Sequence, residues 1–263
     1  MLKKAARAAQ IDEMADLVMR AHKAKQPCPR LSEQNPRFDL RTAYQVQKAY
    51  VERRLADGQI GGFKAGLTSK AAQQHYGFHE PVAGVLYASG RLEGSPIIDH
   101  SQFGYLILDQ EIGFELGVRI TEPLKDVKAL KASVRSIRPM FEVADAGSAE
   151  DFEVVRMLDV VAENCGSAQY IAGAPKAPGE VDLSRVLVTT TRDGEQVNWW
   201  EGKYPDVDQW AGALWLANVT ISHGWEIEPG HILMTGALGT FLGVSGKYRG
   251  EFGGLGMIEF EIR

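Results

Sequence analysis

Residues 106–118 read LILDQEIGFELGV, and this segment has the pattern of a long, largely buried β-strand. Successive side chains of a strand point to opposite faces, so Leu108 and Phe114 share one face while Asp109 and Glu111 share the other. From the rise of a strand, the two acidic residues lie roughly 7 Å apart at the backbone. Like charges at that spacing repel each other unless a cation lies between them.

A third acidic residue interrupts a second apolar strand. In residues 138–145, RPMFEVAD, Glu142 stands among apolar residues, where a charge is costly if it is buried without a partner. Two interpretations stay open: Asp109, Glu111 and Glu142 lie on a solvated sheet face, or their oxygens hold a hard cation such as Mg²⁺ or Mn²⁺. The histidines form no H-E-x-x-H pattern and no cluster with cysteine, so a histidine metal site is not expected.

Around these two strands the sequence has an α+β pattern. Asp39 and Ser69 are typical helix N-caps, and from about Pro81 short apolar runs alternate with Gly, Pro and Asp. Helices are expected over residues 3–25, 39–56, 69–77, 125–134 and 206–223. We therefore expect a helical segment at residues 1–80 packed on a β-rich core at residues 81–263, in one continuous domain.

Composition and charge exclude several classes of protein. The chain has 263 residues and a formal net charge of -5, which does not suit a nucleic-acid-binding surface. Two cysteines in a chain of this length are not a disulfide framework. The first residues carry charge throughout and no run of 18 apolar residues occurs. We expect a cytoplasmic protein with neither a nucleic acid nor a membrane as its partner.

Several sequence blocks, in order along the chain, resemble one known family. They are residues 61–87 (GGFKAGLTSKAAQQHYGFHEPVAGVLY), 108–117 (LDQEIGFELG), 138–145 (RPMFEVAD), 159–173 (DVVAENCGSAQYIAG), 213–239 (ALWLANVTISHGWEIEPGHILMTGALG) and 254–262 (GLGMIEFEI). They resemble the 2-hydroxypenta-2,4-dienoate hydratases and 4-oxalocrotonate decarboxylases of the fumarylacetoacetate hydrolase superfamily.

The resemblance implies a fold and a metal site. It implies a mixed β-roll of the fumarylacetoacetate hydrolase C-terminal-domain type, preceded by an N-terminal helical segment. It also implies that Asp109, Glu111 and Glu142 together hold one divalent ion, Mg²⁺ or Mn²⁺. At the first of these positions the hydratases usually have Glu, so Asp109 is shorter than the family pattern by one methylene group.

The resemblance also implies catalytic and substrate-binding residues. Lys64 and Glu163 are the expected catalytic residues, although Glu163 stands where the family usually has Asp. The expected substrate-binding residues are Ser69, Asn164, Ser167, Thr235 and Gly236. For each group a purely structural interpretation also stays open. Lys64 could be an exposed loop residue, residues 163–167 could form a capped turn, and Thr235 and Gly236 could mark the end of a strand where a turn begins.

The expected activity is that of a metal-dependent lyase on a small anionic 2-oxo or 2-hydroxydienoic acid. The sequence TSKAAQ is similar to the T-S-K-x-x-Q of the hydratases, which add water to a 2-hydroxy-2,4-dienoate to give a 4-hydroxy-2-oxo acid. A 4-oxalocrotonate-type decarboxylase acting on a 2-oxo-enedioate is the first alternative. The second is a non-catalytic or weakly active subunit that supports such an enzyme.

We predict that the protein forms a homo-oligomer, and the resemblance implies that it can assemble with a partner enzyme of the same pathway. The family it resembles is usually oligomeric, and five tryptophans exceed what a small core needs. Sedimentation velocity at micromolar concentration checks the first expectation, and a single monomeric species would contradict it.

Overall fold

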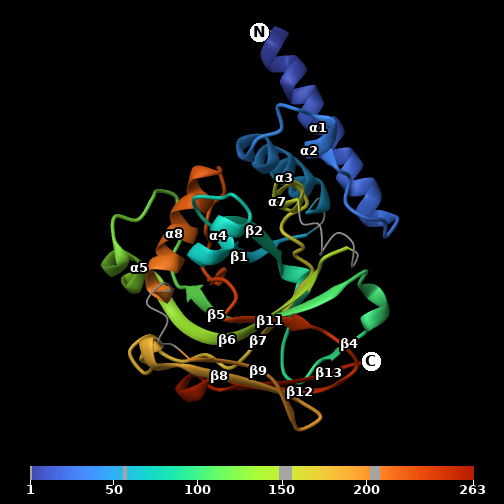
Figure 1. Ribbon diagram of the computed structural model, residues 1–263. Helices are drawn as coiled ribbons and strands as arrows, with labels where there is room; N and C mark the ends of the chain where they lie inside the picture. The colour runs from blue at the N-terminus through green and yellow to red at the C-terminus, as the bar shows by residue number, and fades with distance from the viewer. Residues whose placement is uncertain (1, 56–57, 148–155, 202–207) are drawn as a thin grey trace.

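The computed structural model describes residues 2–55, 58–147, 156–201 and 208–263. Within them two curled, mixed β-sheets lie one above the other, and the helices gather over and beside the larger sheet (Figure 1). The α+β class and the helical N-terminal segment expected from the sequence are confirmed.

The larger sheet contains the strands that carry the three acidic residues. Its hydrogen-bonded order is β2-β1-β10-β5-β6-β7-β3, and β11 also pairs with β5. The strands are β1 (Ile60–Gly66), β2 (Val82–Tyr87), β3 (Arg91–Leu92), β5 (Leu106–Leu116), β6 (Val134–Asp145), β7 (Gln169–Ala172), β10 (Ile232–Met234) and β11 (Gly239–Leu242). One edge of β5 pairs along its length with β6, and the other pairs first with β11 and then with β10.

The smaller sheet packs beneath the larger one. Its order is β4-β13-β12-β8-β9. The strands are β4 (Ile97–Ile98), β8 (Leu187–Arg192), β9 (Glu195–Glu201), β12 (Gly246–Glu251) and β13 (Met257–Ile262). Phe141 of β6 packs edge-on against Phe252 and Phe260, with ring centroids 5.6 and 5.1 Å away. Aromatic packing of this kind fills the space between the two sheets.

Five helices lie close to where the sequence predicted them, whereas the short helices α2 (Leu31–Gln34) and α7 (Met157–Ala162) were not predicted, and α2 falls in a stretch interpreted from its prolines as a loop. The five are α1 (Leu2–Lys23), α3 (Leu40–Arg54), α4 (Lys70–His75), α5 (Val127–Ser133) and α8 (Gln209–Ser222). Asp39 accepts a hydrogen bond from the Thr42 amide, and Ser69 accepts one from the Ala72 amide, so both N-cap predictions are confirmed. The expected start of the last helix at residue 206 lies outside the described residues.

The sheet begins earlier than the sequence indicated. The sequence placed the onset of β-structure near Pro81 and left the segment of Lys64 open to interpretation as a loop, but β1 starts at Ile60. Gly62 has φ +151°, and a Cβ there would lie 2.0 Å from the Ile232 carbonyl oxygen. Gly62 therefore allows close parallel pairing with β10. The division into residues 1–80 and 81–263 stays a prediction.

The burial of β5 decides against one interpretation that the sequence left open, namely that this strand presents a solvated face. Nearly the whole strand is buried, because the layer of helices covers one face of the larger sheet and the smaller sheet covers the other. Even Glu115, which continues the acidic alternation, is buried and pairs with Arg135 and Arg138. Among the described residues, no helix has the length and apolar character that crossing a membrane requires.

Candidate metal centre

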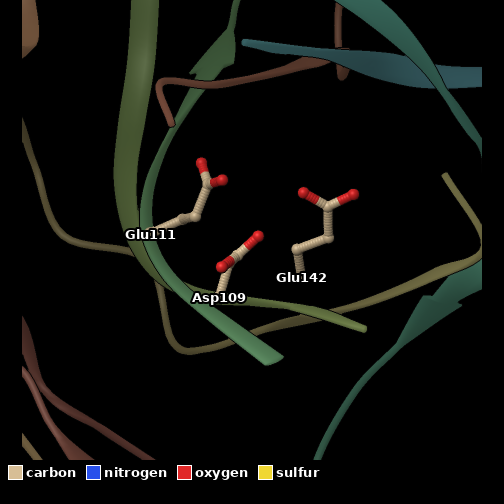
Figure 2. A group of neighbouring side chains, drawn as sticks. All are labelled: Asp109, Glu111 and Glu142. Carbon is tan, nitrogen blue, oxygen red and sulfur yellow. The ribbon is translucent and has the colours of Figure 1, made fainter. Parts of the chain in front are cut away.

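Three carboxyl groups meet on one face of the larger sheet. Asp109 and Glu111 come from β5 and Glu142 comes from β6, and their candidate ligand oxygens all lie within 4.8 Å of one another. Figure 2 shows the three carboxyl groups turned toward a common space. Glu111 and Glu142 are only 1% and 2% exposed, so the interpretation of these two acids as part of a solvated face is wrong.

The strand register brings the three residues together. Asp109 stands directly opposite Glu142 in the antiparallel pairing of β5 with β6. Side chains in such cross-strand positions are immediate neighbours, with Cβ atoms about 5 Å apart. Glu111 follows two residues along β5 and so points to the same face. Phe141, the residue before Glu142, points to the opposite face and anchors β6 in the layer between the sheets.

A turn between β10 and β11 holds Glu111. The Gly236 amide donates a 2.7 Å hydrogen bond to Oε2 of Glu111 at the point where β5 changes partner strand. Gly236 has φ +103°, and a Cβ there would lie 2.4 Å from Cγ2 of Thr68, so only glycine fits this turn without a rearrangement. The amide that was expected to meet a substrate carboxylate is directed at a protein carboxylate instead.

Lys64 lies beside the acidic cluster and is not an exposed loop residue. Its side chain comes from β1 and the residue is only 5% exposed. Its Nζ donates to Oε1 of Glu142 and, over 2.7 Å, to the carbonyl oxygen of Cys165. Burial alone would lower the pKa of Lys64, but the carboxylate of Glu142 and other nearby negative groups raise it above the ordinary value. The pairing with Glu142 therefore favours the ammonium form of Lys64.

Asp109 has a partner that the sequence did not suggest. Thr240 stands opposite Asp109 in the pairing of β5 with β11, and its Oγ1 donates to Oδ1 of Asp109. No sequence pattern joins the two residues, which are 131 positions apart. Only the register of β11 against β5 reveals the pair.

The pKa values in the cluster reflect burial and mutual repulsion. Burial first, and then the charges of Glu142 and Asp109, raise the pKa of Glu111 well above its ordinary value. Burial also raises the pKa of Glu142 to about 7, although Lys64 opposes the shift. Burial raises the pKa of Asp109, and the hydrogen bond from Thr240 opposes that change. The site thus favours neutralisation of these carboxylates, either by protonation or by a bound cation.

The donor set fits a hard divalent cation. When all groups are ionised, the three carboxylates and the one ammonium carry three negative charges and one positive, a net of two negative. Carboxylate oxygens without nitrogen or sulfur donors suit Mg²⁺ or Mn²⁺. A divalent ion would balance that charge, so the residues fit the ion that the sequence predicts. Their binding of the ion stays a prediction.

A cavity of 260 Å³ opens beside this cluster. Lys64, Asp109 and Thr240 line it together with Glu163 and Cys165, while Glu111 and Glu142 lie behind them. Its size suits a small organic acid better than a drug-sized ligand. The structure thus brings both expected catalytic residues, Lys64 and Glu163, to one cavity at the edge of the candidate metal centre.

The turn that follows α7 has an unusual backbone. Asn164, Cys165 and Gly166 have φ values of +71°, +55° and +64°, so two residues with side chains adopt the left-handed conformation in succession. The Asn164 side chain accepts from the amide of Val85 and donates to its carbonyl oxygen, which fixes the turn to β2. Asn164 is fully buried by these contacts, so its side chain serves the strand rather than the cavity.

The remaining predicted substrate residues lie away from the 260 Å³ cavity. Ser69 caps α4, and Thr235 bonds to Gln209 and to the Ile112 carbonyl oxygen behind Glu111. Ser167 lines a neighbouring cavity of 630 Å³, where Glu163 also contributes to the wall. Their direct contact with a substrate stays a prediction, and the geometry gives Ser69 and Thr235 a structural role.

Solved structures show the same fold. The chain superposes on 4-oxalocrotonate decarboxylase from Pseudomonas putida G7 with a TM-score of 0.88 and 23% identity, over 97% of this chain and 98% of that one. A fumarylpyruvate hydrolase from Pseudomonas aeruginosa is more distant, with a TM-score of 0.59 and 16% identity over 78% of this chain and 89% of the other. The expected β-roll of the fumarylacetoacetate hydrolase type is confirmed.

Curated relatives match over most of the chain. A 2-keto-4-pentenoate hydratase of Paraburkholderia phymatum is 29% identical over 252 residues, covering 94% of this chain and 95% of the relative. A TodF product hydratase of Pseudomonas putida is 30% identical over 211 residues, covering 79% and 78%. The chain belongs to the hydratase and decarboxylase family of the fumarylacetoacetate hydrolase superfamily. No family model matches it, so its place in the family follows from these relatives.

Replacement of one cluster residue tests the metal assignment. Glu111→Gln keeps the side-chain shape and the oxygen that accepts from the Gly236 amide, but it removes a negative charge. Mn²⁺ affinity should therefore fall by roughly 100-fold, the upper end of the range for losing a group that supports a metal site. The fold should persist, because one of three mutually repelling acids is gone. Titration calorimetry measures the affinity, with the exposed Glu259→Gln as a matched control. Equal binding by all three proteins, or none by the wild type, would show that the assignment is wrong.

The raised carboxyl pKa values predict a pH-dependent response to metal. Because the pKa of Glu142 is about 7 in the folded protein and 4.5 without its surroundings, the folded state holds a proton that the unfolded state releases between these values. This contribution to stability is complete below pH 4.5 and is lost as the pH rises through 7. Metal binding needs the ionised form, so Mg²⁺ should raise Tm more at pH 8 than at pH 6. Differential scanning fluorimetry at both pH values checks this, and a larger shift at pH 6 would contradict it.

Proposed function

We propose that this protein adds water to a 2-hydroxy-2,4-dienoate and releases a 4-hydroxy-2-oxo acid. The observation that supports this most directly is that Lys64, Asp109 and Glu163 line one small cavity, while Asp109 also belongs to a cluster of three converging carboxylates. Relatives named 2-keto-4-pentenoate hydratase and 2-hydroxyhexa-2,4-dienoate hydratase support the same reaction class. The two related 4-oxalocrotonate decarboxylase structures contain magnesium with adipate and calcium with acetate, which supports a divalent ion and an organic acid.

In this proposal Asp109, Glu111 and Glu142 hold the divalent ion. When bound, such an ion polarises the carbonyl of a 2-oxo acid as a Lewis acid. The protein's own contribution is to bury the ligand residues, to fix Glu111 through Gly236 and Asp109 through Thr240, and to exclude bulk water from the inner wall of the cavity.

Lys64 supplies the positive charge that an anionic substrate needs. The chain as a whole has a net charge of -5, so a local cation at the cavity wall is required to attract a carboxylate. The raised pKa of Lys64 suits binding more than proton release while Glu142 is ionised beside it. Neutralisation of Glu142 by a cation would lower that pKa and make proton donation to the substrate carbon easier.

Glu163 is the proposed acceptor for the proton of the attacking water. It follows α7 directly and contributes to the walls of both neighbouring cavities. Cys165 does not compete as a nucleophile, because burial raises the pKa of its thiol to about 12. General acid–base chemistry by Lys64 and Glu163 therefore needs no covalent intermediate.

A 2-oxo-enedioate decarboxylase is the second candidate, supported by the fold it shares with 4-oxalocrotonate decarboxylase. The hydratase has more support, because the relatives matched over 94% and 89% of this chain are named hydratases. A non-catalytic subunit has less support, since a drifted site would not be expected to keep three converging carboxylates and a buried lysine. A homo-oligomeric, cytoplasmic enzyme that associates with a pathway partner remains part of the proposal.

A substrate panel tests the function directly. Purified enzyme with Mg²⁺ or Mn²⁺ is given 2-hydroxypenta-2,4-dienoate, 2-hydroxyhexa-2,4-dienoate and 2-oxohex-3-enedioate. Loss of dienol absorbance with incorporation of ¹⁸O from labelled water is the expected result, and Glu111→Gln serves as the inactive control. Release of carbon dioxide alone would replace the hydratase with the decarboxylase. Tight metal binding without turnover of any compound would favour the non-catalytic subunit.

Lys64→Met separates the two roles of the lysine. Methionine has a similar length and lacks both charge and proton, so we expect kcat to fall by about 100-fold, within the range for a lost proton donor. A lysine that only binds the substrate would instead raise KM and leave kcat unchanged. Because Lys64 also contacts Glu142, turnover is measured at saturating Mn²⁺. Lys128→Met, an exposed lysine on α5, is the control, and values within twofold of wild type for both variants would remove Lys64 from the mechanism.

A further inference from the structure

Thr240, Asp109 and Glu142 form a row across three neighbouring strands. Asp109 on β5 is the register partner of Glu142 on one side and of Thr240 on the other. Oγ1 of Thr240 donates a hydrogen bond to Oδ1 of Asp109. One oxygen of this carboxylate is therefore held by β11, and the other is free of that hydrogen bond and available to the cluster.

The length of the aspartate side chain gives this contact its importance. Asp109 has one methylene group fewer than the glutamate that the resemblance leads one to expect at this position. The terminal torsion of an aspartate is broad, so an unrestrained carboxyl group turns easily. A hydrogen bond to an ionised carboxylate is among the stronger ones and fixes this rotation. Thr240 thus restricts the one ligand in the cluster that has the shortest reach.

We propose that Thr240 is a positioning residue of the metal centre, whose hydroxyl orients the short Asp109 carboxylate so that its second oxygen faces Glu111 and Glu142. This inference rests on the metal-dependent function proposed above and identifies a residue that acts on that site through Asp109. Thr240 is exposed, lies on a short strand and lines the cavity wall beside Asp109. Replacement of Thr240 therefore disturbs little of the core, and its main effect should fall on the orientation of the Asp109 carboxylate.

Two substitutions at Thr240 test the hydroxyl. Thr240→Val keeps the β-branched shape and removes the donor, whereas Thr240→Ser keeps the donor. Calorimetry with Mn²⁺ should show affinity about tenfold weaker for Thr240→Val, the usual scale for losing a partner of a metal ligand. Thr240→Ser should bind within about twofold of the wild type. Thr191→Val, on β8 of the smaller sheet, is the matched control and should not alter affinity.

A second background separates positioning from a general effect of the β11 strand. In Asp109→Glu the longer side chain reaches the cluster without help, so adding Thr240→Val there should change Mn²⁺ affinity by less than threefold. Wild-type affinity in Thr240→Val would overturn the proposal. So would the same tenfold loss in both backgrounds, because the hydroxyl would then not be compensating for the shorter aspartate. If Asp109→Glu binds no metal, the native aspartate is indispensable, which also overturns the compensation argument.

The readout keeps this inference separate from the proposed function. Mn²⁺ affinity and the Mn²⁺ electron paramagnetic resonance spectrum are measured without substrate, so they do not depend on hydratase activity. A wild type that hydrates a dienoate while Thr240→Val binds Mn²⁺ normally would overturn the role of Thr240 alone. A tenfold effect of Thr240→Val in a protein that turns over no dienoate would overturn the proposed function and leave the positioning role intact.

Discussion

Convergence of three carboxyl groups in one small space, with Glu111 and Glu142 buried and Asp109 at the cavity wall, is the constraint on which the rest of the structure depends. Like charges at this distance in a poorly hydrated site repel strongly, so the folded protein must neutralise or hold them. Each acidic residue has a dedicated partner: the Gly236 amide bonds Glu111, the Thr240 hydroxyl bonds Asp109, and the Lys64 ammonium bonds Glu142. These partners come from the turn before β11, from β11 itself and from β1, so the cluster draws together segments that are far apart in the sequence.

The two-sheet architecture supplies the stiffness that such a cluster needs. Residues of β6 alternate between the face of the site and the face of the aromatic core, so that Glu142 faces the site while Phe141 packs against Phe252, which follows β12, and Phe260 of β13. Movement of Glu142 would therefore disturb an aromatic core. On the other edge of β5 the change of partner from β11 to β10 creates the turn in which the amide of Gly236 becomes available to Glu111.

The lysine and the turn after α7 connect this rigid centre to the cavity. Lys64 joins Glu142 to the carbonyl oxygen of Cys165, and Asn164 fixes the same turn to β2. The left-handed conformations of Asn164 and Cys165 are maintained by these contacts, which is a common way for a protein to hold strained backbone near a functional site. Glu163, at the start of this turn, is thereby placed at the cavity wall together with Lys64.

Local sequence patterns alone determined much of the secondary structure of this protein and identified its candidate metal ligands. The alternation in residues 106–118 placed Asp109 and Glu111 on one face, Asp39 and Ser69 marked helix starts, and the acidic interruption at Glu142 marked a candidate ligand, because these signals depend only on neighbouring residues. The tertiary structure decided which face is buried, that the glycines before Lys64 belong to a strand, and that the Gly236 amide and the Asn164 side chain serve protein groups. It also revealed Thr240 as the partner of Asp109. Such contacts depend on strand order and register between distant segments, and those are set by packing of the whole chain rather than by any local pattern.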